Sequence, residues 1–233
     1  MNVPQLWLVR HAPVLAPPGI CYGQLDLPVE LEATARCAER LASALPRTLL
    51  HRSVLRHSTL RRCELLAQAA YALRPDFTLK SDARLRELNF GAWEGLAWAT
   101  LPRAELDTWA AQLATYAPGG GERLIDMLAR VGAALQEDST MASETGSDVV
   151  WIAHAGVARC VQWLLGERAQ RGNPPCSAHW PVHAPAPGAW ALYPLPFSPS
   201  AAVHRPQEAH TRPAQGAAQE QTPSAPMAPP GPV

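Results

Sequence analysis

The sequence has no excess of charge of either sign and no long apolar run, and each absence narrows the possible functions. Its 20 Lys and Arg balance 20 Asp and Glu, so no net field would attract nucleic acid or an anionic membrane surface. No hydrophobic stretch is long enough to cross a bilayer, and Met1-Asn2-Val3-Pro4 has no charged region or cleavage site of a secretion signal. We therefore expect a cytoplasmic protein that binds neither nucleic acid nor membrane.

Paired cysteines and the motifs of several enzyme classes are also missing. The cysteines are odd in number and never form Cys-x-x-Cys, which argues against a disulfide framework and a structural zinc site: Cys21, Cys37, Cys63, Cys160 and Cys176. None has an arginine six residues later, which excludes a cysteine phosphatase. There is no Walker A loop, Gly-x-Ser-x-Gly elbow or His-Glu-x-x-His motif. Four late histidines match no metal-ligand spacing and are interpreted as solvated: His179, His183, His204 and His210.

Runs of helical and of strand length alternate along most of the chain. The pattern predicts strands over 6–9, 77–80, 149–152 and 190–193, and helices over 31–45, 60–73, 103–116, 122–137 and 157–165. This alternation favours a three-layer α/β/α sandwich with a mostly parallel central sheet. The last 40 residues hold ten of the 24 prolines and few large apolar residues. We therefore expect one domain over 1–197 and a Pro/Ala-rich disordered tail over 198–233.

Two of the predicted strands end at a histidine. Arg10-His11 follows the first apolar run, and His154-Ala155-Gly156 follows the clearest strand of the chain. Open α/β folds bind their ligands at the carboxyl edge of the sheet, so the two strand ends are expected to converge on one anion. A neutral imidazole is a good phosphoryl acceptor, and a guanidinium matches phosphate oxygens.

Two further segments carry charged groups that fit the same chemistry. Ser58 is a candidate N-cap that places Arg62 in the first turn of a helix, where the helix end and the guanidinium both favour an anion. Glu87 stands among apolar neighbours and is the candidate general acid, while Glu94 is interpreted as structural. Each segment alone has a simpler explanation: a solvated basic turn for Arg62, and a salt bridge to Arg84 or Arg86 for Glu87.

Together the four segments resemble the signatures of the histidine phosphatase superfamily, in its phosphoglycerate mutase-like branch. They stand in the family's order: Leu8-Val9-Arg10-His11, Ser58-x-Leu60-x-Arg62, Leu85-x-Glu87-x-x-Phe90-Gly91-x-Trp93-Glu94-Gly95 and His154-Ala155-Gly156. The segments over 21–28 and 62–67 are most similar to alpha-ribazole phosphatases of cobalamin biosynthesis. The substrate expected from this similarity is a small phosphomonoester, alpha-ribazole 5'-phosphate first.

The resemblance implies a role for each site residue. His11 would attack phosphorus and become a phosphohistidine, and Glu87 would protonate the leaving alcohol and then activate water. The phosphoryl oxygens would be held by Arg10, Arg62 and His154, with no metal and no cofactor. Tyr22 and Gly23 would belong to the substrate-binding site, and the loop over 119–121 to its rim.

The sequence departs from the family pattern close to His11. Ala12 replaces the usual glycine, Pro13 and Val14 replace polar residues that mutases use, and Leu66 replaces a threonine. These changes favour a phosphatase over a phosphoglycerate mutase. A broad-specificity sugar phosphatase stays an alternative, as does a non-catalytic protein that binds phosphorylated ligands. The retention of Arg10, His11, Arg62, Glu87 and His154 argues against the last.

Overall fold

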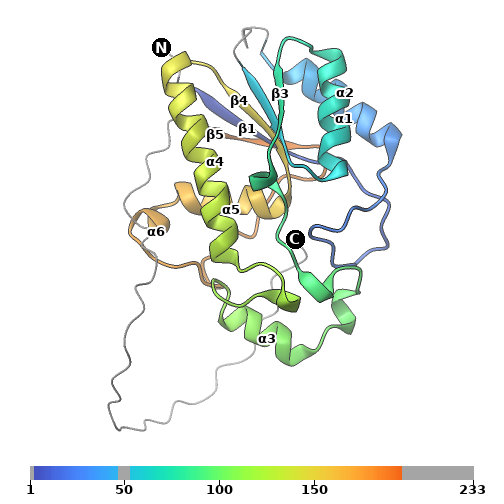
Figure 1. The fold of residues 1–233 in the computed structure, drawn as a ribbon, viewed down its shortest axis with the longest axis vertical. Helices are drawn as coiled ribbons and strands as arrows, with labels where there is room; N and C mark the ends of the chain where they lie inside the picture. Colours follow the sequence, from blue (N-terminus) through green and yellow to red (C-terminus); the bar gives the residue numbers. More distant parts are fainter. Residues whose placement is uncertain (1–2, 47–52, 196–233) are drawn as a thin grey trace.

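Five strands form one sheet at the centre of the computed structural model, which describes residues 3–46 and 53–195 (Figure 1). Their order across the sheet is β3-β2-β4-β1-β5, with bounds β1 (Gln5–Arg10), β2 (Val54–His57), β3 (Thr78–Ser81), β4 (Val149–Ala153) and β5 (Trp190–Pro194). The first four strands are parallel, and β5 pairs antiparallel with β1 at the edge. The predicted mostly parallel α/β fold is therefore confirmed, whereas the predicted tail lies outside the described residues.

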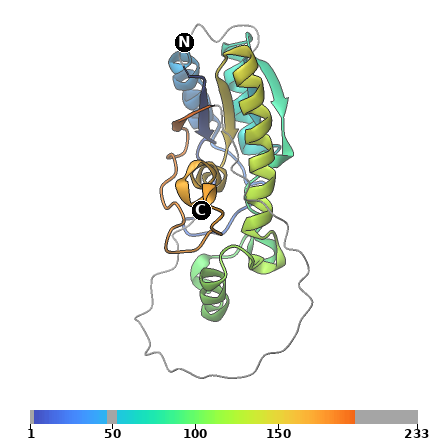
Figure 2. The ribbon, with the colours of Figure 1, turned by 90° about the vertical axis from the view of Figure 1, so that its left-hand side faces the viewer.

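Two apolar clusters cover the two faces of the sheet. One packs α4 (Leu124–Thr145) and α5 (Ala155–Leu165) against strand residues such as Leu8 and Trp151. The other packs α1 (Leu31–Ala44) and α2 (Arg61–Leu73) against Val9 and Ile152. Alternate residues of β1 and β4 thus point to opposite clusters, as the pleat of a strand requires. Figure 2 shows the sheet nearly edge-on between these layers.

A small lobe of short helical turns extends the fold beyond the sheet, on the side towards which β3 points (Figures 1 and 2). It contains α3 (Arg103–Ala111), and its core is a cluster of aromatic rings with centroids 5.4 to 6.4 Å apart: Phe90, Trp93, Trp98, Trp109 and Tyr116. The short helix α6 (Glu167–Gln170) follows α5. None of the helices in the described ranges is both long and apolar enough to cross a membrane.

Strand β2 was not predicted, and helix α4 runs eight residues past its predicted end at 137. One buried ion pair explains both differences. The Nε of Arg56 on β2 lies 2.8 Å from Oδ1 of Asp138 on α4, and both side chains are almost fully buried. Asp82 and Glu137 also accept hydrogen bonds from this guanidinium. Polar residues of this kind are typical of a loop. Here they face the core, because each is paired with a polar partner, and Arg56 and Asp138 stand about 80 residues apart in the sequence.

We expect Arg56→Met to lower the free energy of unfolding by about 3–5 kcal/mol, because it leaves the Asp138 carboxylate buried without its cation. Urea unfolding checks this. The matched control is Arg103→Met, which breaks an exposed pair with Asp107 and is expected to cost less than about 1 kcal/mol. The double variant Arg56→Met/Asp138→Leu should recover most of the loss; if it does not, the charge imbalance is not the cause.

Candidate active site

The two predicted histidines lie side by side at the carboxyl edge of the sheet. β1 and β4 are parallel neighbours, and their register pairs Arg10 with Ala153, the last residue of each strand. His11 and His154 directly follow these two strand ends. The backbone N–H of His11 donates to the Ala153 carbonyl at 3.0 Å. The ring centroids are 5.3 Å apart and both side chains are buried.

The surroundings of His11 leave one ring nitrogen ready to react. Its Nδ1 lies 2.7 Å from the carbonyl oxygen of Ala12. A carbonyl only accepts hydrogen bonds, so Nδ1 carries the proton and Nε2 keeps its lone pair. Burial first, then the positive charge of Arg62 and Arg10, lowers the pKa of His11 to about 3. The ring is therefore neutral near pH 7, as a nucleophile requires.

His154 is held by two polar side chains. The Nε of Arg62 donates to its Nδ1 at 3.3 Å, which places the proton on Nε2, and Ser58 Oγ accepts from Nε2 at 2.9 Å. The prediction that Ser58 is an N-cap was wrong: the N-cap of α2 is Leu60, and the Ser58 hydroxyl is directed to His154 instead. Burial lowers the pKa of His154 as well, with Arg62 and His11 adding to the effect.

Arg62 lies in the first turn of α2, as predicted, and its side chain is buried rather than solvated. Its two terminal nitrogens donate to main-chain carbonyls, NH2 to Gly23 at 2.5 Å and NH1 to Leu25 at 3.0 Å. A guanidinium has five N–H donors, so donors remain for an anion. The ring of Tyr22 contacts the guanidinium, with its centroid 5.5 Å from Cζ. Tyr22 and Gly23 thus border the predicted clamp, Gly23 through its carbonyl.

The carboxylate of Glu87 sits at the N-terminus of α5. Its Oε2 accepts the backbone N–H of Gly156 at 2.9 Å and its Oε1 that of Leu88 at 2.9 Å. A Cβ at position 156 would lie 2.1 Å from Oε1, so only glycine leaves room for this contact. Neither Arg84 nor Arg86 forms the salt bridge of the simpler interpretation, because Arg84 pairs with Asp82 and Glu137, and Arg86 donates to Thr59.

Glu94 and the predicted loop over 119–121 contact backbone groups around the site and not its reacting side chains. The Glu94 carboxylate accepts the N–H groups of Gln24, Leu25 and Phe90, which ties the loop beside Arg62 to the lobe. The loop over 119–121 packs against the backbone of residues 89–91 so closely that a Cβ at Gly119 or Gly121 would overlap it. It therefore supports the segment that carries Glu87.

Two arginines beside the site were not predicted. Arg130 donates to the carbonyls of Arg84, Arg86 and Glu87 and so fixes the backbone around Glu87. Arg159 lies on α5, one turn after Gly156. Burial lowers the pKa of Arg159, while the charge of Glu87 raises it and that of Arg10 lowers it. The sequence signal for Arg159 is its position one helical turn after His-Ala-Gly.

The lowered pKa of His11 predicts an acid-sensitive fold. A histidine in an unfolded chain has a pKa near 6.5, so below that pH the unfolded chain binds a proton at position 11 that the native state does not bind. We therefore expect the stability supplied by neutral His11 to be present above about pH 6.5 and lost towards about pH 3, at roughly 1.4 kcal/mol per pH unit. Urea unfolding at several pH values checks this. His11→Gln should show a shallower slope, and an unchanged slope would contradict the assignment.

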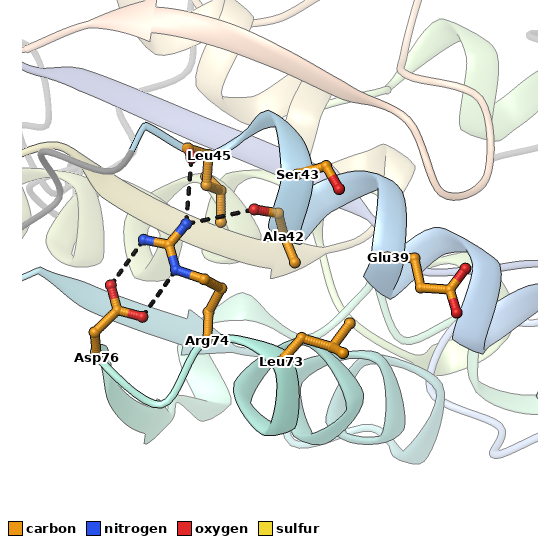
Figure 3. A pocket seen from close by; sticks show the side chains of 7 residues that line it. All are labelled: Glu39, Ala42, Ser43, Leu45, Leu73, Arg74 and Asp76. Atoms are coloured by element: carbon orange, nitrogen blue, oxygen red, sulfur yellow. Dashed lines mark hydrogen bonds and ion pairs between the residues drawn. The ribbon is translucent and has the colours of Figure 1, made fainter.

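A cavity of about 670 Å³ lies away from these residues, between the C-terminal ends of α1 and α2 (Figure 3). Its one guanidinium, Arg74, donates to both carboxylate oxygens of Asp76 and to the carbonyls of Ala42 and Leu45. These are helix-end and surface contacts, so this cavity is not the predicted site. Within residues 3–46 and 53–195, no group of three or more His, Cys, Asp or Glu side chains is arranged to hold a metal ion.

The comparison with protein families agrees with this geometry. Residues 6–176 match the family model of the histidine phosphatase superfamily, branch 1. The chain belongs to this superfamily. The match spans every residue of the site described above.

The chain is also similar to individual proteins, in sequence and in structure. Glucosyl-3-phosphoglycerate phosphatase of Mycobacterium tuberculosis is 38% identical over 104 residues, which are 40% of this chain and 45% of that protein, less than half of its length. The solved mycobacterial glucosyl-3-phosphoglycerate phosphatase covers 82% of this chain and 90% of its own, with a TM-score of 0.66 and 25% identity. TTHB049 of Thermus thermophilus covers 81% and 92%, with a TM-score of 0.56 and 28% identity.

Proposed function

We propose that this chain hydrolyses phosphomonoesters through a phosphohistidine on His11. The observation that carries the proposal is the tautomer of His11: Nδ1 donates to the Ala12 carbonyl, so Nε2 presents a lone pair beside Arg62 and His154. Nε2 attacks phosphorus, the P–O bond to the alcohol breaks, and Glu87 gives the departing oxygen a proton. The Glu87 carboxylate then takes a proton from water, which cleaves the P–N bond and releases phosphate.

The charges around His11 suit this transition state. Phosphoryl transfer has little covalent chemistry for a protein to perform, and most catalysis comes from positioning and from positive charge on the equatorial oxygens. Arg10 and Arg62 supply that charge. For His154 to donate to the phosphoryl group through Nδ1, two hydrogen bonds have to change. The Ser58 hydroxyl becomes the donor to Nε2, which a hydroxyl can do, and the Nε–H of Arg62 turns from Nδ1 to the phosphoryl group.

For the substrate we propose alpha-ribazole 5'-phosphate. The support is the resemblance over residues 21–28 and 62–67, and Tyr22, Gly23 and Leu25 of the first segment contact the guanidinium of Arg62, which begins the second. Asp26, in the first segment, accepts the backbone N–H of Arg61, the residue just before the second, at 2.9 Å. The name of the mycobacterial relative points to a different ester, glucosyl-3-phosphoglycerate, which is the second candidate. A phosphoglycerate mutase and a broad sugar phosphatase are further alternatives.

Two measurements test the proposal. Acid-labile labelling of the enzyme by a ³²P-phosphomonoester is expected in wild type and absent in His11→Asn. Values of kcat/KM for alpha-ribazole 5'-phosphate, glucosyl-3-phosphoglycerate, 3-phosphoglycerate and glucose 6-phosphate then rank the substrates. Labelling with a preference for another ester would overturn only the substrate, whereas neither labelling nor turnover would favour a non-catalytic binding protein.

A further inference from the structure

A cavity of about 280 Å³ opens beside the proposed catalytic residues, in the loop between His11 and α1. Two residues of the site belong to its lining, Arg10 and Tyr22. The remaining lining side chains that are large enough to make contacts are apolar: Val14, Pro17, Pro18 and Ile20. Among the described residues that line it, Arg10 alone is charged.

The walls of this cavity are fixed by main-chain contacts. Val14 forms a β-bridge with Val29, and Ile20 forms one with Ala97 in the lobe. The N–H of Trp98 donates to the carbonyl of Gly19 at 2.9 Å. Gly19 has a φ of +77° and directly follows Pro18. A type II turn requires such a positive φ at its third residue and favours proline before it. A preformed wall of this kind costs little ordering on binding.

The cavity is joined to the phosphoryl site by the two residues they share. Arg10 lines the cavity and carries one of the positive charges beside His11, while the ring of Tyr22 contacts Arg62. A phosphoryl group held by Arg10 and Arg62 would therefore stand at the mouth of the cavity. The alcohol portion of the same molecule would extend along Tyr22 and the two prolines.

We propose that this cavity binds the alcohol portion of the substrate and selects phosphomonoesters whose organic part is uncharged and largely apolar, such as a flat aromatic ring. The proposal rests on the proposed function, because it assumes that phosphorus is attacked by His11. A carboxylate in the cavity would need a cation of its own, and Arg10 is already used by the phosphoryl group. A ring, in contrast, gains contact with the proline and tyrosine rings.

Three simple probes test this on the wild-type enzyme. 2-Naphthyl phosphate and phenyl phosphate release alcohols of similar acidity but differ by one fused ring, so the ratio of their kcat/KM values reports contact beyond the reacting centre. We expect a ratio of about tenfold or more in favour of the naphthyl ester, the size of effect that added apolar contact gives in a fitted pocket. 3-Phosphoglycerate, which carries a carboxylate, is expected to be the poorest of the three.

Variants test whether the naphthyl preference arises in this cavity. Ile20→Ser should reduce the naphthyl preference about fivefold, whereas Ile20→Val, which keeps an apolar side chain, should retain most of it. Leu73→Ser is the matched control, because Leu73 is apolar, half exposed and lines the remote cavity on α1 and α2. Circular dichroism and thermal unfolding of each variant show that it is folded.

The outcomes separate this inference from the proposed function. A ratio near one in wild type, or one that Ile20→Ser leaves unchanged, would overturn the inference while the phosphatase chemistry stands. A preference for 3-phosphoglycerate that is lost in Arg159→Met would also overturn it, and would place the organic part against α5. If no ester is hydrolysed and no acid-labile label forms, the proposed function itself fails.

Discussion

His11→Asn is expected to lower kcat for p-nitrophenyl phosphate by at least about 10⁴-fold, the range found when a nucleophile is removed from a hydrolase. The asparagine amide can still donate to the Ala12 carbonyl, so the hydrogen bond that orients position 11 is retained. It has no nitrogen lone pair in the place of Nε2. The loss therefore reports the nucleophile and not the fold.

The measurement is steady-state kinetics together with the acid-labile label. His179→Asn is the matched control, since this histidine lies in the chain segment after α6, and it should keep wild-type turnover. A His11→Asn enzyme that keeps more than about a tenth of the wild-type kcat would show that His11 does not form the covalent bond. Attack by water held in the same pocket would then be the better mechanism.

The placement of His11 and His154 could be predicted because it depends on a local rule. Each histidine follows a short buried strand, and the carboxyl ends of parallel strands share one edge of the sheet. The structure adds that β1 and β4 are adjacent, which the order of strands along the chain does not reveal. This adjacency brings the two rings to 5.3 Å.

What could not be predicted depends on partners far away in the sequence. The four residues of β2 include an arginine and a histidine and look like a solvated turn, yet Arg56 is buried against Asp138. The same pair places polar residues of α4 on its inner face, which is why that helix appeared to end early. Helix α3 shows the opposite error: it ends at Ala111, and the chain then turns so that Tyr116 approaches Trp93.

The sequence marks Ser58 and Gly156 as special positions in the site, but it does not show which groups contact them. Ser58 precedes a helix as an N-cap does, and its hydroxyl is instead bound to His154. Gly156, which has no side chain, lets another group approach the backbone closely. The group that approaches it is the Glu87 carboxylate, which reaches α5 from a segment nearly 70 residues earlier. A single sequence shows that space is needed at such a position, but not which group fills it.

This contact makes Gly156→Ala the most informative substitution outside the reacting groups. The added methyl would stand 2.1 Å from Oε1 of Glu87, so the carboxylate has to leave the Gly156 N–H. If Glu87 protonates the leaving alcohol, kcat/KM for a sugar phosphate should fall by about 10²-fold or more, because a sugar alkoxide is a poor leaving group. The value for p-nitrophenyl phosphate should fall far less, since nitrophenolate departs without a proton.

The comparison uses kcat/KM because this quantity covers only the steps up to departure of the alcohol, before Glu87 acts on water. Glu87→Gln should show the same contrast between the two esters. Gly132→Ala is the matched control: its new methyl would meet only the side chain of Leu164, at 3.7 Å, and both esters should react as in wild type. Equal losses on the two esters in Gly156→Ala and Glu87→Gln would mean that the carboxylate positions the phosphoryl group and another residue supplies the proton.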